Sequence, residues 1–322
     1  MLKKNKETSL KTTKRVKTED EEEEKDRVKT PSKNKKAKSK PIHLKEDKDT
    51  YDAAEDQSSN GNDEHDDDGS EVEMYNESHI KPFGFTIPRP KGSPFPDAIS
   101  PDTLVFLAEL AENNDRDFFH FRSKEWAAAR KDFMDFVGLL STEIHHVDPS
   151  IRVEESKKAV YRQNRDLRFS NDKSPYKRNL SASFSQTGRK FLNAGYFLSI
   201  KPNNQSLIAA GMWQPDKYRL ANMRSSIIRH ADLLREALST DVIKEAFDGK
   251  YGVDILDTTD RLKVAPKDIA KDHPEIDLLR FRSFAVEKTF TDEEVVSPEF
   301  MDKVMDVVEA LVPFVAVINS WV

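Results

Sequence analysis

The chain has 322 residues, a formal net charge of −6 and no cysteine, which excludes disulfides, thiolate nucleophiles and cysteine-ligated metal sites. It has no run of about 18 apolar residues and no apolar signal-peptide core behind its charged N-terminus, so we expect a soluble protein of the nucleus or cytoplasm. Beyond residue 80 the chain carries 35 basic and 36 acidic residues. This balance gives no domain-wide electrostatic argument for nucleic-acid binding.

Residues 1–80 read as a disordered charged tail, because they lack the apolar periodicity that a core requires. Residues 1–50 hold 17 Lys and Arg against 11 Asp and Glu, whereas residues 51–80 hold 11 acidic residues and no Lys or Arg. The basic clusters at residues 14–17 and 33–40 are typical of nuclear import signals or nucleic-acid tethers. The alternative is a tail that only keeps the protein soluble. Import machinery is therefore a possible partner, and no membrane partner is expected.

Residues 81–100 contain several prolines and glycines and read as a linker, with an aromatic stretch at residues 83–87 that could dock against the domain. The domain is expected to span residues 101–322. Ser100 followed by Pro101 is a good helix start, and Leu104 and Leu107 continue with helical spacing. A second apolar stripe predicts a helix from Ser123 to about residue 148.

The pattern then changes to a period of two. Residues 196–200 and 207–213, separated by a Pro-Asn-Asn turn, predict a β-hairpin, and residues 153–169 and 180–184 are candidate partner strands. Helices are expected after Pro215 and within residues 233–247, and a strand is expected at residues 284–286. A capping box at residues 291–294 stops that strand, and Ser297 opens a last helix in the manner of Ser100, with Pro313 as a kink. The expected fold is α+β, a single domain in which several helices pack on a small, mainly antiparallel sheet.

The densest polar segment spans residues 162–178. If residues 160–170 form a strand, then Arg162, Asn164, Asp166 and Arg168 project from one face. Arginine forks can grip a phosphate or a carboxylate, and the following loop could close over such a ligand. The candidate anion-binding residues are Arg162, Arg165, Asp166, Arg168, Asp172, Lys173, Tyr176 and Lys177.

A second interpretation of this segment is a structural salt-bridge network, because Asp166 lies between two arginines and Asp172 lies beside Lys173. A third is catalysis, in which the arginines stabilise developing negative charge and Asp166 or Asp172 moves protons. Asp166 paired with His273 as a general base is also conceivable. Residues 113, 114 and 116 are expected to end the first helix and could meet the arginines in space.

At this segment the sequence resembles the domain-of-unknown-function family numbered 2461. The family pattern Arg-x-x-Arg-Asp-x-Arg-Phe-Ser-x-Asp-Lys-Ser/Thr-Pro-Tyr-Lys is matched from Arg162 to Lys177. The resemblance extends over about residues 101–321, and it departs from the family pattern at Asp268, where a glycine is usual. It implies the family's domain but no particular reaction.

Motifs for a nucleotide-binding glycine loop or a serine hydrolase are missing from the sequence, and we expect no cofactor and no metal. Three functions remain open. The first is a binding module whose cationic cluster takes a phosphorylated small molecule or a nucleic-acid backbone. The second is an enzyme acting on a phosphorylated or carboxylated substrate. The third is a nuclear interaction protein with a purely structural salt-bridge cluster.

Overall fold

The computed structural model describes residues 75–91, 95–189 and 193–322. All but the last six residues of the expected tail lie outside these ranges, and so do both of its basic clusters. Within the described ranges the α+β expectation is confirmed. The elements run in chain order as follows: η2 Glu77–His79, α1 Pro101–Glu112, α2 Arg116–Phe121, α3 Ser123–Val147, α4 Ser156–Ala159, β1 Leu180–Ser185, β2 Gly195–Ile200, β3 Ser206–Met212, α5 Lys217–Ala237, α6 Asp241–Ala246, η3 Gly252–Ile255, α7 Ile276–Leu279, β4 Phe284–Phe290, α8 Asp292–Val295 and α9 Phe300–Ser320.

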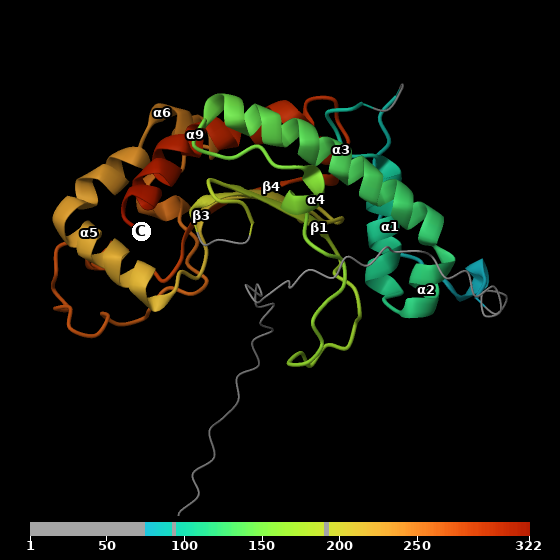
Figure 1. Cartoon of the computed structure of the whole chain (residues 1–322), viewed down its shortest axis with the longest axis horizontal. Helices are drawn as coiled ribbons and strands as arrows, with labels where there is room; N and C mark the ends of the chain where they lie inside the picture. The colour runs from blue at the N-terminus through green and yellow to red at the C-terminus, as the bar shows by residue number, and fades with distance from the viewer. Residues whose placement is uncertain (1–74, 92–94, 190–192) are drawn as a thin grey trace, which may run out of the picture. The chain divides into compact units, whose positions relative to one another are not determined.

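The four strands form one antiparallel sheet in the order β1-β2-β3-β4. Every second side chain of the sheet faces a core that is closed by α3 and α9, which lie along that face in Figure 1. Leu198, Ile208 and Val286 illustrate this face, because each is at most 1% exposed. The large aromatic side chains of the two helices fill the space above them; Phe136 of α3 stacks on Phe300 of α9, with ring centroids 5.2 Å apart.

The strand turns and helix starts follow local chemistry. The β2–β3 turn places Asn203 and Asn204 at positive φ, a conformation that asparagine tolerates better than most residues. Ser100 caps α1 through its side chain, and Thr291 forms the predicted capping box with Glu294 at α8. The start of α9 differs from the expectation, because that helix begins at Phe300 after Glu299, which makes no side-chain cap.

The residues that precede α1 pack against the domain. The side chain of Ile87 is buried, and Phe83 and Phe85 pack partly buried on the core. Tyr75 contacts Phe118 and Phe121 of α2 at centroid distances of 6.4 and 5.6 Å. The expectation that residues 83–87 dock on the domain is therefore confirmed.

Two local predictions were wrong. Residues 153–169 do not form a strand: they contain the short helix α4, and pairing survives as isolated bridges at Val160 and Asn164. Arg116 does not end the first helix but begins α2, because Asp115 accepts a hydrogen bond from Phe118 N and caps a new helix there. In both places side-chain hydrogen bonds to the backbone outweigh the apparent periodicity.

Candidate functional site

The polar segment forms an irregular hairpin at the edge of the sheet, which we call the arginine hairpin (residues 160–178). Val160 pairs with Ala182 of β1, and Tyr161 N donates to Ser181 O at 2.9 Å. Farther out, Lys177 N donates to Gln163 O and Arg165 N donates to Pro175 O, both at 2.9 Å. The hairpin is thus built from a few antiparallel backbone bonds and depends on its side chains for the rest of its order.

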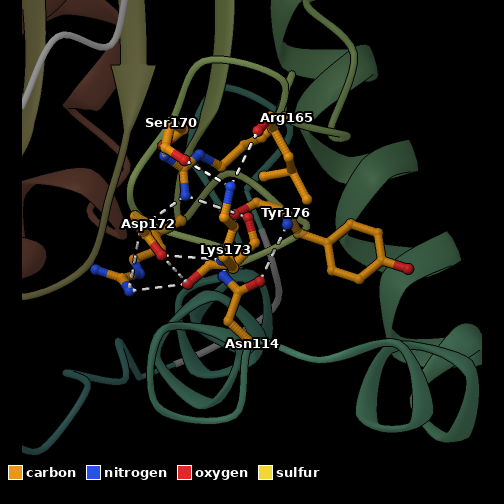
Figure 2. Close-up of polar contacts among 9 residues, drawn as sticks. Asn114, Arg165, Ser170, Asp172, Lys173 and Tyr176 are labelled. Atoms are coloured by element: carbon orange, nitrogen blue, oxygen red, sulfur yellow. Dashed lines mark hydrogen bonds and ion pairs between the residues drawn. The ribbon is translucent and has the colours of Figure 1, made fainter.

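Arg165 and Asp172 are at the centre of the hairpin (Figure 2). The Arg165 side chain is 15% exposed, and its Nη1 lies 2.6 Å from Asp172 Oδ2 and 3.2 Å from the carbonyl oxygen of Ser174. Its Nη2 donates to Ser170 Oγ at 3.2 Å. Asp172 also accepts hydrogen bonds from the backbone and hydroxyl of Ser174, at 2.9 and 2.7 Å. These two side chains therefore tie together both arms of the hairpin.

The remaining charges at the tip also have partners within the hairpin. Arg168 Nε donates to both oxygens of Asp166 at 3.0 Å, and Lys173 Nζ donates to the Ser170 carbonyl at 2.9 Å. Residues 165–170 form a loop and not a strand, and Phe169 is 92% exposed on it beside the Arg168 guanidinium. Arg162, Asn164, Asp166 and Arg168 consequently do not share one strand face.

The base of the hairpin is fastened to α2 and the turn that precedes it. Asn114 Oδ1 accepts from Tyr176 N and Asn114 Nδ2 donates to Tyr176 O, both at 3.0 Å. The Tyr176 ring points away from the ion pairs in Figure 2 and stacks on Phe119 with centroids 4.0 Å apart. The prediction that the residues after α1 meet the arginine segment is confirmed through Asn114. Tyr176 itself serves as an anchor.

The electrostatics of the two hairpin carboxylates are those of ion-paired groups. Hydrogen bonds from the backbone and hydroxyl of Ser174, assisted by Arg165, lower the pKa of Asp172 to about 2. Hydrogen bonds from the Arg168 side chain and backbone hold the pKa of Asp166 well below its usual range. Both groups are therefore ionised at neutral pH, which suits a scaffold better than proton transfer. The two residues considered as a general-base pair have other partners. Asp166 binds Arg168, and His273 accepts a hydrogen bond from Glu275 N at 3.1 Å.

Lys177 occupies a different environment, at the point where the hairpin joins the sheet. Its Nζ lies 5.0 Å from the centroid of the Tyr161 ring, and Arg189 Cζ lies 4.9 Å from the same centroid. The Tyr161 ring also meets Phe197 edge to face at 6.0 Å, and its hydroxyl shares a hydrogen bond with Ser183. Burial raises the pKa of Tyr161, so the phenol stays neutral between two cations.

Tyr161 stands at one end of what we call the second face of the sheet, the face opposite the α3–α9 core. The row Ser183, Phe197, Ala209 and Glu287 crosses this face from β1 to β4 in register. The first three side chains are half-buried and Glu287 is exposed. Burial and the neighbouring Asp257 carboxylate nevertheless raise the pKa of Glu287. The face is thus cationic at its β1 edge and acidic at its β4 edge.

Sequence reasoning selected Lys177 but missed Tyr161, Arg189 and Glu287. One signal in the sequence is the alternation of serine with apolar residues along residues 180–185, which is typical of a strand with one more polar face. That alternation does not show which residues lie on the face, because Tyr161 and Glu287 reach it through pairings between distant segments.

The described residues contain no group of three or more His, Asp or Glu side chains placed to hold a metal ion. No helix among them is long and apolar enough to cross a membrane.

The chain was also compared with known proteins. No curated protein and no solved structure matches it. One family model matches residues 102–316, which covers α1 to most of α9 and includes the arginine hairpin and the whole sheet. The resemblance noted in the sequence is therefore confirmed: the chain belongs to the family described as conserved hypothetical protein DUF2461.

Proposed function

We propose that the domain is a binding module for an anionic ligand, phosphorylated or carboxylated, which it holds where the arginine hairpin meets the second face of the sheet. The observation that carries this proposal is the convergence of Lys177 and Arg189 on the single ring of Tyr161. A lysine and an arginine next to neutral hydroxyl donors provide both charge and hydrogen bonds for an oxyanion.

The rest of the hairpin supports this site indirectly. Arg165, Arg168 and Lys173 are engaged with Asp172, Asp166 and backbone carbonyls, so they stiffen the hairpin that presents Lys177. Preorganisation of this kind lowers the entropic cost of binding. Of the eight candidate residues, Lys177 contacts the ligand in this proposal. Arg162, which follows Tyr161 in the chain and is exposed, can assist Lys177.

The second face gives the ligand a surface beyond its anionic group. Phe197 and Ala209 are neighbours in register and supply an apolar floor, and Glu287 follows at the far edge. The face thus offers cations, then an apolar floor, then a carboxylate. A ligand with an anionic end, a flat apolar body and a hydrogen-bond donor at its other end fits this order.

The test measures binding of inorganic pyrophosphate and of benzoate to the full chain by calorimetry at low salt. Lys177→Gln and Arg189→Gln should each weaken binding of at least one of the two probes about tenfold, since each removes a charged contact. Lys131→Gln is the matched control, because Lys131 is an exposed lysine on α3, away from the hairpin. Unchanged affinity in both Lys177→Gln and Arg189→Gln, or an equal loss in Lys131→Gln, would refute the proposal.

One observation favours a second candidate function, an enzyme acting on such a ligand. Glu287 has a raised pKa and a second carboxylate, Asp257, nearby, which is the arrangement expected of a group that exchanges protons. A turnover screen on phosphorylated and carboxylated compounds, with Glu287→Gln as the control, separates an enzyme from a binding module. Turnover that persists in Glu287→Gln would remove this residue from the mechanism.

A further inference from the structure

The outer end of the arginine hairpin, which we call the hairpin tip (residues 166–173), extends away from the sheet as the yellow-green loop between α4 and β1 in Figure 1. It carries Phe169, which is 92% exposed, more than any other large apolar side chain of the described residues. The Cζ atom of Arg168 lies 5.6 Å from the centroid of the Phe169 ring. A single exposed apolar residue is common in proteins, so what matters is how this one is presented.

The backbone on both sides of Phe169 is held by side chains. Before it, Asp166 accepts hydrogen bonds from the backbone and from Nε of Arg168, both at 3.0 Å. After it, the carbonyl oxygen of Ser170 accepts from Lys173 Nζ at 2.9 Å. The tip thus offers an aromatic ring to solvent on an ordered backbone, so a partner that contacts the ring has little conformational entropy to overcome.

The hairpin also concentrates positive charge. Residues 160–178 hold six Arg and Lys against two Asp, whereas the rest of residues 81–322 holds 29 basic and 34 acidic residues. Arg162, Lys173 and Arg178 are exposed on the hairpin. An anionic partner is therefore attracted to the hairpin and not to the remainder of the domain.

The chemistry of the tip favours one kind of anionic partner. A membrane surface needs several apolar side chains to insert, but Phe169 has polar neighbours in Ser170 and the exposed Asn171. A nucleic-acid duplex keeps its bases stacked inside, where an exposed ring cannot reach them. A single strand offers both phosphates and open base faces, which match an aromatic ring flanked by cations.

We propose that the hairpin tip binds single-stranded nucleic acid, with one base stacked on Phe169 and the neighbouring phosphates at Lys173 and Arg178. The guanidinium of Arg168 beside the ring adds a cation to the stack. Ring stacking and phosphate contacts read no base edge, so binding should depend little on sequence. This inference goes beyond the proposed function, because it concerns the tip of the hairpin and not its junction with the sheet.

The experiment measures the fluorescence anisotropy of a labelled single-stranded oligothymidine of about ten nucleotides with the full chain at low salt. Phe169→Ala should weaken binding about tenfold, because the stacked base loses its partner. Phe169→Trp should bind at least as well as wild type, whereas Phe169→Leu, which lacks a flat ring, should lose as much as Phe169→Ala. Tyr218→Ala is the matched control, because Tyr218 is 70% exposed on α5 with Lys217 Nζ 4.7 Å from its ring centroid.

The phosphate contacts are tested by salt. Arg178→Gln should reduce the slope of log affinity against log salt concentration by about 0.7, the value for one phosphate contact of a single strand. Arg229→Gln, which removes an exposed arginine of α5, should leave the slope unchanged. An unchanged slope in Arg178→Gln, or an equal reduction in Arg229→Gln, would overturn the placement of the phosphate.

The other outcomes decide on the site and on its partner. Unchanged oligothymidine affinity in Phe169→Ala, or an equal loss in Tyr218→Ala, would overturn the site. Full binding by Phe169→Leu, or an equal loss in Phe169→Ala with a duplex of the same length, would overturn base stacking. If Phe169→Ala lost binding only to phosphatidylserine vesicles, the partner would be a membrane surface instead.

The proposed function is tested separately. Inorganic pyrophosphate has no base, so it should bind wild type and Phe169→Ala equally well, whether or not the oligonucleotide binds. An equal loss of pyrophosphate and oligonucleotide binding in Phe169→Ala would mean that Phe169 acts through the order of the hairpin, and would overturn stacking. Failure of pyrophosphate binding in wild type would count against the proposed function alone.

Discussion

The arginine hairpin and the arginines around α7 hold the same kind of side chain in different ways. In the hairpin each of Arg165 and Arg168 has a carboxylate of its own, and the two ion pairs shape a loop. Around α7, backbone carbonyls hold Arg224 of α5 and Arg280 instead. An arginine-rich stretch of sequence therefore does not by itself identify an anion site; what decides is whether acids or carbonyls meet the guanidinium groups.

The largest difference should appear when the central arginine of the hairpin is removed. Arg165→Ala leaves Asp172 and the Ser174 carbonyl without their donor in a partly buried position, so we expect a loss of about 2–3 kcal/mol in the free energy of unfolding. Urea denaturation measures it. Arg165→Lys should recover less than half of the loss, because a lysine cannot make the forked contacts. Full recovery by lysine would mean that charge alone matters there.

The stability that Asp172 gives to the hairpin should also depend on pH. The pKa of Asp172 is lowered to about 2, so its contribution is complete above the pKa of an unfolded aspartate, about 3.9, and is lost as the pH falls through about 2. Asp172→Asn should cost about 1 kcal/mol at pH 7, discounted for the partial exposure of the side chain. Urea titrations from pH 7 to pH 2.5 should show the wild-type and variant curves converging below pH 4. Parallel curves over this range would contradict the ion-pair role.

Much of the fold could be predicted because it is encoded locally. The caps at Ser100 and Thr291, the Asn203–Asn204 turn and the apolar stripe of α3 each depend on residues a few positions apart. The predicted strand over residues 153–169 failed for a physical reason. Its polar side chains bond to nearby backbone and to one another, and these contacts replace the regular ladder that alternation alone would suggest.

The sequence by itself determined the α+β class, the start of α1 after Ser100 and the family signature from Arg162 to Lys177. Only the tertiary structure decided which charges meet. Arg165 and Asp172 are seven residues apart, so a sequence can suggest their pairing, whereas Arg235 meets Glu275 and Asp277 because α5 packs beside α7. Pairing of charges depends on distance in space, and a sequence gives that distance only between near neighbours.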